Sequence, residues 1–185
     1  MTESLPASWE CVLDRAAVEA GVERLASRIQ PCIDAGPCVL MGVMTGGMYP
    51  LIRLIDHLQG DFMLDYCHAT RYGDALKGGG LEWIKEPGLD MSGRTLIIVD
   101  DIWDEGYTLT AVAERCAGLG AERVLTAVLF IKDRARDPAL QAPDLDAGLH
   151  VPDRYVFGCG MDMKYRWRHL PAVYALTESD DEAQT

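Results

Sequence analysis

The chain has 185 residues, of which 49% are hydrophobic and 25% are charged, with a formal net charge of −12. This length is enough to bury a hydrophobic core, and no apolar run approaches the roughly 20 residues that a membrane span needs. The negative charge argues against nucleic-acid binding, which depends on basic patches that neutralise phosphates. We therefore expect one domain over residues 1–185 that binds neither membrane nor nucleic acid.

The compartment is predicted from the cysteines and from the start of the chain. The six cysteines form no CxxC pair, and several lie inside apolar runs, so we expect buried free thiols of a reducing compartment. The first ten residues lack a signal-peptide pattern. Both observations favour a cytoplasmic protein.

The N-terminal part predicts a helix and then a strand that leads into a glycine turn. Apolar residues repeat at helical spacing from Val18 to Ile29, with Asp14 as N-cap and Pro31 as the stop. The apolar run 38–43 indicates a buried strand. After it comes the turn Met44-Thr45-Gly46-Gly47, and then a second helix, predicted to carry Leu51, Ile52, Leu54, Ile55 and Leu58 inward. Such a turn offers N–H groups to an anion, although a Gly-Gly turn alone is weak evidence.

Residues 62–70 are predicted to form the next strand, and residues 71–80 an exposed loop. The loop contains Tyr72, Asp74, Lys77 and three consecutive glycines. A polar, glycine-rich stretch between apolar segments is usually a mobile connection.

The most informative stretch runs from Thr95 to Thr108. Its first five residues indicate a buried strand of a parallel sheet, and Asp100 and Asp101 follow directly. Asp104 and Gly106 come next, and an amphipathic helix is predicted to begin after Tyr107. We expect the acids on a strand-to-helix turn at the carboxyl edge of a sheet, where open α/β sheets bind ligands. Acids beside an anion site favour a sugar phosphate, and the alternative is an ordinary turn with solvated acids.

The C-terminal part predicts a further buried strand over 124–131, followed by Lys132, which by itself is best explained as a solvated strand tip. Residues 137–152 are predicted to be a connection. The next segment contains Tyr155-Val156-Phe157-Gly158, Gly160-Met161-Asp162 and Tyr165-Arg166-Trp167-Arg168. Core packing and ligand contact are equally good explanations for Trp167. Residues 178–185 are predicted to be a disordered acidic tail.

The stretch from Val99 to Thr108 resembles the phosphoribosyl pyrophosphate signature of the type I phosphoribosyltransferases. Lys132 and the segment 151–171 narrow the resemblance to the hypoxanthine-guanine branch, over about residues 39–176. The resemblance implies an α/β fold with a mostly parallel central sheet flanked by helices, a small hood and a flexible lid loop. It also implies a homo-oligomer, because relatives form dimers and tetramers.

The implied activity is purine salvage. A phosphoribosyl group would pass from 5-phosphoribosyl 1-pyrophosphate (PRPP) to a 6-oxopurine, hypoxanthine or guanine, giving IMP or GMP and pyrophosphate with Mg²⁺ as cofactor. Asp104 would be the catalytic residue that manages the proton at purine N7. Asp100 and Asp101 would hold the ribose hydroxyls directly or through the metal. The 5′-phosphate would lie on Glu105, Gly106, Tyr107 and Thr108.

The remaining site residues follow from the same resemblance. Lys132 would donate to the purine 6-oxo group, Tyr155 would stack on the base, and the Val156 backbone would meet its Watson–Crick edge. Pyrophosphate would be bound by Thr45, Gly46 and Arg168, a second Mg²⁺ by Asp162, and the lid would begin with Arg71 and Tyr72.

Two positions depart from the family pattern. The second residue of the pyrophosphate turn is often basic but is Thr45 here, and we expect Arg71 to supply the missing charge. The family usually has a small hydroxyl residue where this chain has Glu105. Because a carboxylate would repel phosphate, we predict that its side chain points outward and that only its N–H serves.

Three alternatives stay open at the level of the sequence. A xanthine-preferring phosphoribosyltransferase is the nearest, because backbone groups near the purine 2-position decide the ranking of hypoxanthine, guanine and xanthine. A PRPP sensor or RNA-binding regulator would keep the fold without the chemistry, although the acidic composition disfavours RNA. A receiver-type phosphotransfer protein would leave the glycine turn and the purine segment unexplained.

Overall fold

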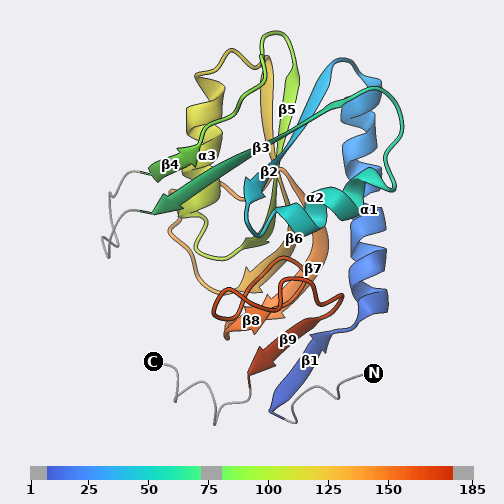
Figure 1. Cartoon of the computed structure of the whole chain (residues 1–185), viewed down its shortest axis with the longest axis vertical. Helices are drawn as coiled ribbons and strands as arrows, with labels where there is room; N and C mark the ends of the chain where they lie inside the picture. The colour runs from blue at the N-terminus through green and yellow to red at the C-terminus, as the bar shows by residue number, and fades with distance from the viewer. Residues whose placement is uncertain (1–7, 72–80, 177–185) are drawn as a thin grey trace.

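The computed structural model describes residues 8–71 and 81–176, in which a large sheet with helices on both faces stands above a small sheet (Figure 1). The large sheet contains β2 (Cys38–Met44), β3 (Met63–Arg71), β4 (Leu81–Lys85), β5 (Thr95–Trp103), β6 (Arg123–Asp133) and β7 (Leu145–Pro152). Its strand order is β4-β3-β2-β5-β6-β7, and every neighbouring pair except β3–β4 is parallel. The predicted, mostly parallel α/β sheet is confirmed.

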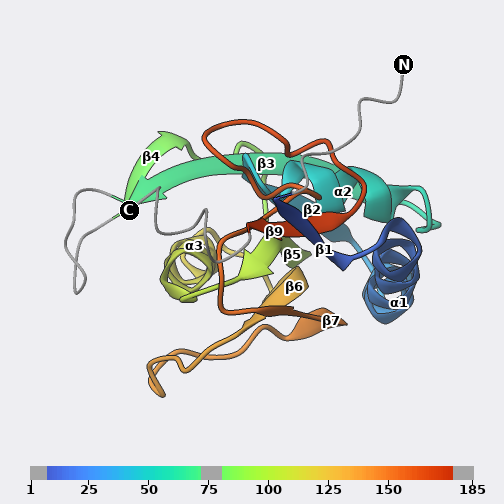
Figure 2. The same ribbon diagram turned by 90° about the horizontal axis from the view of Figure 1, so that it is seen from below.

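The helices divide the core into two clusters, one on each face of the sheet. Helices α1 (Arg15–Asp34) and α2 (Met48–Ile55) pack on one face, where buried residues such as Leu25 and Leu54 meet Ile97 of β5. Helix α3 (Tyr107–Ala117) packs on the other face, where Val112 meets Ile98. Figure 2 shows α3 apart from α1 and α2 in this way. Ile97 and Ile98 point to opposite faces of the sheet, and helices cover both faces. This explains why the sequence of β5 is a continuous apolar run.

The predicted start of α1 is confirmed, but its predicted end is wrong. Asp14 is the N-cap, and its carboxylate accepts a hydrogen bond from the Ala17 N–H at 2.8 Å. Pro31 does not stop the helix, which continues to Asp34. Proline removes one N–H donor, but burial of Ile33 against the core holds the last turn in place. The inward face of α2 is also only partly as predicted, because the Ile52 side chain is exposed.

Strand β7 lies inside the segment that was predicted to be a connection, so that prediction is wrong. Its residues Leu145, Ala147, Leu149 and Val151 point toward the core and alternate with more exposed residues. This period of two is the pattern of a strand with one buried face. The prolines and aspartates around it obscured the pattern.

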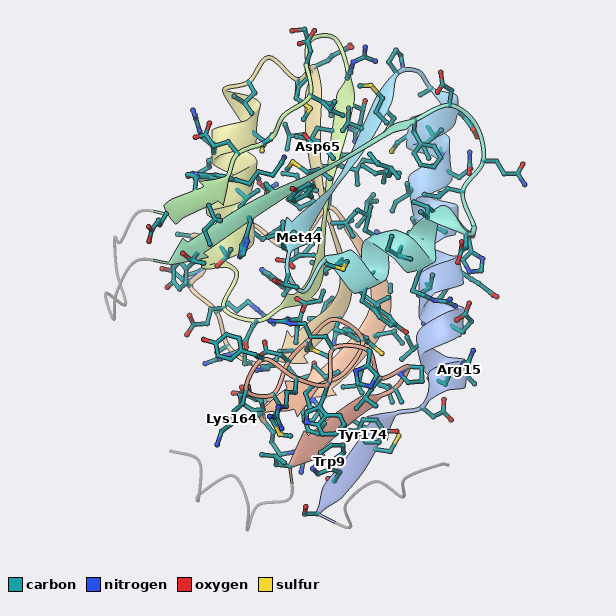
Figure 3. All side chains as sticks on the ribbon, viewed as in Figure 1. Trp9, Arg15, Met44, Asp65, Lys164 and Tyr174 are labelled. Carbon is teal, nitrogen blue, oxygen red and sulfur yellow. The ribbon has the colours of Figure 1, made fainter. Side chains whose placement is uncertain are left out.

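The small sheet, with strand order β1-β9-β8, is formed by β1 (Trp9–Leu13), β8 (Val156–Phe157) and β9 (Val173–Leu176). We call this sheet and the segment 158–172 the hood. Trp9 packs edge-on against Phe157 at 4.8 Å and against Trp167 at 4.9 Å between ring centroids. It also lies beside Tyr174 (Figure 3). Trp167 therefore has a packing role.

The cysteines are as predicted, since all six are free and four of them are buried. Among the helices of the described residues, none is long and apolar enough to cross a membrane.

Candidate active site

The paired acids Asp100 and Asp101 lie within β5, which continues to Trp103. Their predicted position on the turn after the strand is therefore wrong. The strand is longer than the apolar run because β6 continues to pair with it, through Ile102 opposite Phe130 and Trp103 opposite Ile131. The Asp101 N–H donates to Asp100 Oδ1 at 2.9 Å, and the Ile102 N–H donates to Asp101 Oδ1 at 2.7 Å. These bonds fix both carboxylates at the carboxyl edge of the sheet.

Burial strongly affects both acids. It raises the pKa of Asp101 to about 6. Burial, together with the neighbouring charge of Asp101, raises the pKa of Asp100 well above its usual range. The nearby Arg168 charge acts in the opposite direction on both groups. Two carboxylates in such a place favour a cation or several hydroxyl donors as partners.

Residues 104–108, which comprise the turn after β5 and the first two residues of α3, border a cavity of about 320 Å³. We call these five residues the phosphate turn. Gly106 has φ +92°, and a Cβ there would lie 2.5 Å from Trp103 Nε1, so glycine is required. The N-terminus of α3 has no capping side chain, and the positive end of the helix dipole points to this cavity edge. The residues that line the cavity include Asp100, Asp104, Glu105, Gly106, Tyr107, Thr108 and Arg134.

Asp104 is paired with two cations at the end of the neighbouring strand, since Lys132 lies in β6 and Arg134 directly follows this strand. Lys132 Nζ lies 2.6 Å from Asp104 Oδ2, and Arg134 Nη1 lies 2.8 Å from Asp104 Oδ1. Burial raises the pKa of Asp104, but the hydrogen bonds from Lys132 and Arg134 outweigh burial and hold it below its usual value. Lys132 is buried, so the interpretation as a solvated strand tip is wrong.

Arg136, to which no role was assigned from the sequence, joins the ends of β5 and β6. Its Nε donates to the Asp104 carbonyl at 2.7 Å and its Nη2 to the Trp103 carbonyl at 2.8 Å, and it also binds the Lys132 carbonyl. The guanidinium lies over the Trp103 ring, 3.9 Å from its centroid. Sequence held a signal for this cluster, since Lys132, Arg134 and Arg136 are spaced by two, and alternate residues of an extended segment share a face.

The glycine turn after β2 lies directly against the paired acids. A Cβ on Gly46 would lie 2.0 Å from Asp101 Oδ2, and one on Gly160 of the hood would lie 2.4 Å from the Gly46 carbonyl oxygen. Thr45 is exposed, and the peptide bond between Met44 and Thr45 is cis. The glycines thus allow β2, β5 and the hood to meet at one place.

The hood brings the remaining described site residues to this edge of the sheet. Arg168 Nη2 lies 2.6 Å from Asp162 Oδ1, and its Nη1 donates to the Gly160 carbonyl at 2.6 Å. The Tyr155 hydroxyl donates to the Asp162 carbonyl at 3.0 Å, which fixes a ring that is 45% exposed. Val156 is buried in β8.

Some predicted features are outside what the structure describes. Arg71 is the last residue of β3, and Tyr72 and the rest of the predicted lid, residues 72–80, lie outside the described residues, as does the predicted tail. The predicted compensation of Thr45 by Arg71 stays a prediction. Glu105 is one of the residues that line the cavity. The outward direction of its carboxylate also stays a prediction.

Comparison with known proteins agrees with this geometry. A family model described as a phosphoribosyl transferase domain matches residues 8–166. Hypoxanthine phosphoribosyltransferase of Salmonella typhimurium is 29% identical over 167 residues, which cover 89% of this chain and 93% of the relative. Hypoxanthine-guanine phosphoribosyltransferase of Bacillus subtilis is 30% identical over 159 residues, which cover 85% and 84%.

The fold has close matches among solved structures. Hypoxanthine phosphoribosyltransferase from Trypanosoma cruzi superimposes with a TM-score of 0.86 over 98% of both chains, at 18% identity. A hypoxanthine-guanine phosphoribosyltransferase from Bacillus anthracis gives a TM-score of 0.84 over 91% of this chain and 98% of that chain, at 22% identity. Family model, relatives and fold agree with the acidic strand end and its turn: this chain is an enzyme of the phosphoribosyltransferase family.

Proposed function

We propose that the enzyme transfers the phosphoribosyl group of PRPP to hypoxanthine or guanine, with Mg²⁺, and so salvages purines as IMP or GMP. The observation that carries the proposal is the pair of Asp104 and Lys132 at the adjoining ends of β5 and β6. This pair combines a proton acceptor and a buried donor beside an anion-suited cavity. An acceptor for a purine N–H and a donor to its 6-oxo group are the two functions that the reaction requires.

The phosphate turn and the paired acids would bind the sugar phosphate. The 5′-phosphate would lie in the cavity at the N-terminus of α3, near Gly106 and the Thr108 hydroxyl, where the helix dipole favours an anion. The ribose hydroxyls would donate to Asp100 and Asp101, which lie deeper along β5. This order along the strand matches the order of the groups along a ribose 5-phosphate.

Lys132 would select a 6-oxopurine over adenine. Its ammonium group has only donors, so the 6-amino group of adenine would leave two donors facing each other in a buried place. Tyr155 would stack on the base, since its exposed ring is held by the hydrogen bond to the Asp162 carbonyl. The Val156 backbone would meet the Watson–Crick edge of the purine.

In the proposed step, purine N9 forms a bond to C1′ of the ribose while the bond from C1′ to the pyrophosphate oxygen breaks. The pyrophosphate leaves with the electron pair of that bond. The proton on N7 passes to the Asp104 carboxylate, which is paired with Lys132 and Arg134 before the base binds. Arg168 and the turn at Thr45 and Gly46 would bind the departing pyrophosphate.

The acidic residues fit a magnesium ion that is bound together with substrate. Carboxylate oxygens suit Mg²⁺, which usually takes one or two carboxylates and completes its shell with phosphates and water. Asp100 and Asp101 provide such a pair, while in the described residues no cluster of three or more candidate ligands could hold a metal alone. Asp162 would serve a second ion once Arg168 moves to pyrophosphate. Bound Mg²⁺ would neutralise charge on the leaving group.

We also propose a homo-oligomer that pairs through the outer side of β3 and α2. Exposed apolar side chains gather there, namely Met48, Ile52, Leu64, Tyr66 and Ile84. Leu64 and Tyr66 lie opposite Leu40 and Gly42 in the sheet, which places them on the α2 side. Several exposed apolar side chains on one face are typical of a protein interface.

The activity is tested by measuring product formation from PRPP and Mg²⁺ with hypoxanthine, guanine, xanthine and adenine in parallel. We expect turnover of hypoxanthine or guanine and none of adenine. Faster turnover of xanthine would make xanthine the preferred base, while the reaction would still be phosphoribosyl transfer to a purine. PRPP binding without turnover of any base would contradict the proposal and favour a sensor.

A further inference from the structure

The two carboxylate oxygens of Asp104 have separate cationic partners. Oδ2 pairs with Lys132, and Oδ1 pairs with Arg134. In the proposed function, Lys132 must turn its ammonium group toward the purine 6-oxo group when the base binds. Asp104 then loses one of its two partners at the moment when it has to be ionised and directed toward N7.

Arg134 is placed to remain as the second partner of Asp104. Its side chain is 32% exposed and lines the cavity of the phosphate turn. The Arg134 N–H donates to the Lys132 carbonyl at 2.9 Å, so the two residues lie on one tight turn at the end of β6. A partly buried carboxylate without any partner would be costly, and a remaining guanidinium removes that cost.

Arg136 makes the support rigid. Besides its bonds to the carbonyls of Trp103 and Asp104, its Nη1 donates to the Arg134 carbonyl at 3.1 Å. The backbone on both sides of the ion pair is therefore tied to one guanidinium. The position of Arg134 relative to Asp104 is therefore set by backbone hydrogen bonds and not by the side chain of Lys132.

We propose that Arg134 is a positioning residue, which holds the Asp104 carboxylate ionised and oriented while Lys132 is engaged by the purine. This inference rests on the proposed function and adds a residue to its machinery. It gives the two arginines different tasks, since Arg136 fixes the backbone and Arg134 fixes the charged side chain.

The inference has a pH signature. The cations that face Asp104 are Lys132 from β6 and Arg134 and Arg136 from the loop after β6. The acids nearby are Glu105, the next residue along the chain, and Asp153, which lies 3.8 Å from Arg134. Removing a cation makes a carboxylate easier to protonate, so its pKa rises and activity is lost at a higher pH on the acid side. The acid limb of kcat reports the substrate complex, where Lys132 is engaged, and that of kcat/KM reports the free enzyme. The kcat limb should therefore move further.

The experiment compares Arg134→Gln, Arg134→Lys and the control Arg115→Gln. Arg115 lies on α3, and the control removes it from its ion pair with Glu86. For Arg134→Gln we expect kcat with hypoxanthine to fall about tenfold at neutral pH, a part of what a general base contributes. We expect its kcat acid limb to move to higher pH and KM for PRPP to change little. Arg134→Lys should restore the limb in part, and Arg115→Gln should behave as wild type.

Each other outcome decides against the inference. If folded Arg134→Gln keeps the kcat and the pH profile of an active wild type, the role of Arg134 is overturned and the proposed function is kept. A raised KM for PRPP with unchanged kcat would make Arg134 a phosphate contact instead. Lower kcat without any movement of the acid limb would indicate a structural role. An inactive wild type would overturn the inference together with the proposed function. Thermal melting of each variant shows whether it is folded.

Discussion

In the proposed function, Asp104 is a proton acceptor that lies close to bound phosphates. Its own charge would repel PRPP, but Lys132 and Arg134 lie within hydrogen-bond distance and neutralise it. The same contacts lower its pKa, so it stays ionised across the neutral range. Asp101 differs from it, since burial raises the pKa of Asp101 to about 6.

Asp104→Asn removes the proton acceptor with little change of shape. We expect kcat with hypoxanthine to fall by about 10²- to 10⁴-fold, the usual contribution of a general base. The affinity for PRPP, measured by titration calorimetry in the presence of Mg²⁺, should change far less, because the phosphate turn and the paired acids are kept.

The matched control is Asp133→Asn, since Asp133 is exposed, follows Lys132 directly and pairs with His150 at 2.7 Å. It should keep wild-type kcat. If both variants lose activity equally, local charge rather than proton transfer is responsible. If Asp104→Asn retains kcat, the assignment of Asp104 is wrong.

At the scale of helices and strands, prediction from sequence succeeded where the local pattern is strong. The buried runs of β2, β5 and β6 and the Asp14 cap of α1 are such patterns. The edge strand β4 was missed although it pairs with the preceding strand β3, because its five residues give only a short pattern. The short strands of the hood were missed too, and there a pairing partner can be distant in sequence. β9, for example, pairs with β1 at the other end of the described chain.

The site could be predicted residue by residue only through the family resemblance, and its supporting contacts could not. Arg134 and Arg136 act through hydrogen bonds to a turn that lies about 30 residues earlier. Gly46 and Gly160 matter because two backbones approach closely, which spacing along the chain does not reveal. Both features depend on tertiary structure.

The cap of α1 gives a prediction at the scale of one element. Asp14→Ala leaves the Ala17 N–H without its acceptor, which should cost about 1 kcal/mol of the free energy of unfolding. For a chain of this size that is a fall of about 2–4 °C in Tm. The measurement is thermal unfolding followed by circular dichroism at 222 nm.

Glu23→Ala is the control, because Glu23 is exposed on the same helix. It should leave Tm almost unchanged. An equal fall in both variants would mean that the loss of negative charge, rather than the cap, determines the effect.

For the whole molecule, the site exists only because two sheets meet. The carboxyl ends of β2, β5 and β6 face the hood (Figure 1). The hood contributes Arg168 and Tyr155 across the close approach of Gly46 and Gly160. At this edge, Lys132 and Arg134 pair with Asp104, and Arg168 pairs with Asp162. In a chain of net charge −12, these cations offset the negative charge that the acids would otherwise present to an anionic substrate.

The face formed by β3 and α2 allows a test of the proposed homo-oligomer. An interface between two identical copies related by a two-fold axis brings the same patch from both copies together. Ile52 is 53% exposed near the middle of α2 and belongs to the patch. Ile52→Glu would place two charges in the interface, because each copy contributes one, and burying unpaired charges is costly. We expect the wild type to sediment as a dimer or tetramer and Ile52→Glu to shift to a smaller species at the same concentration.

Leu89→Glu is the control for this experiment. Leu89 is exposed too, but its N–H donates to Asp65, which points to the opposite face of β3 from Leu64 and Tyr66. A new charge at Leu89 should therefore leave the sedimentation coefficient unchanged. Dissociation by both substitutions would show that added negative charge alone separates the copies, in a chain that is already acidic. An unchanged mass for Ile52→Glu would place the interface on another face, and a monomeric wild type would end the proposal, because the apolar face would then be exposed in solution.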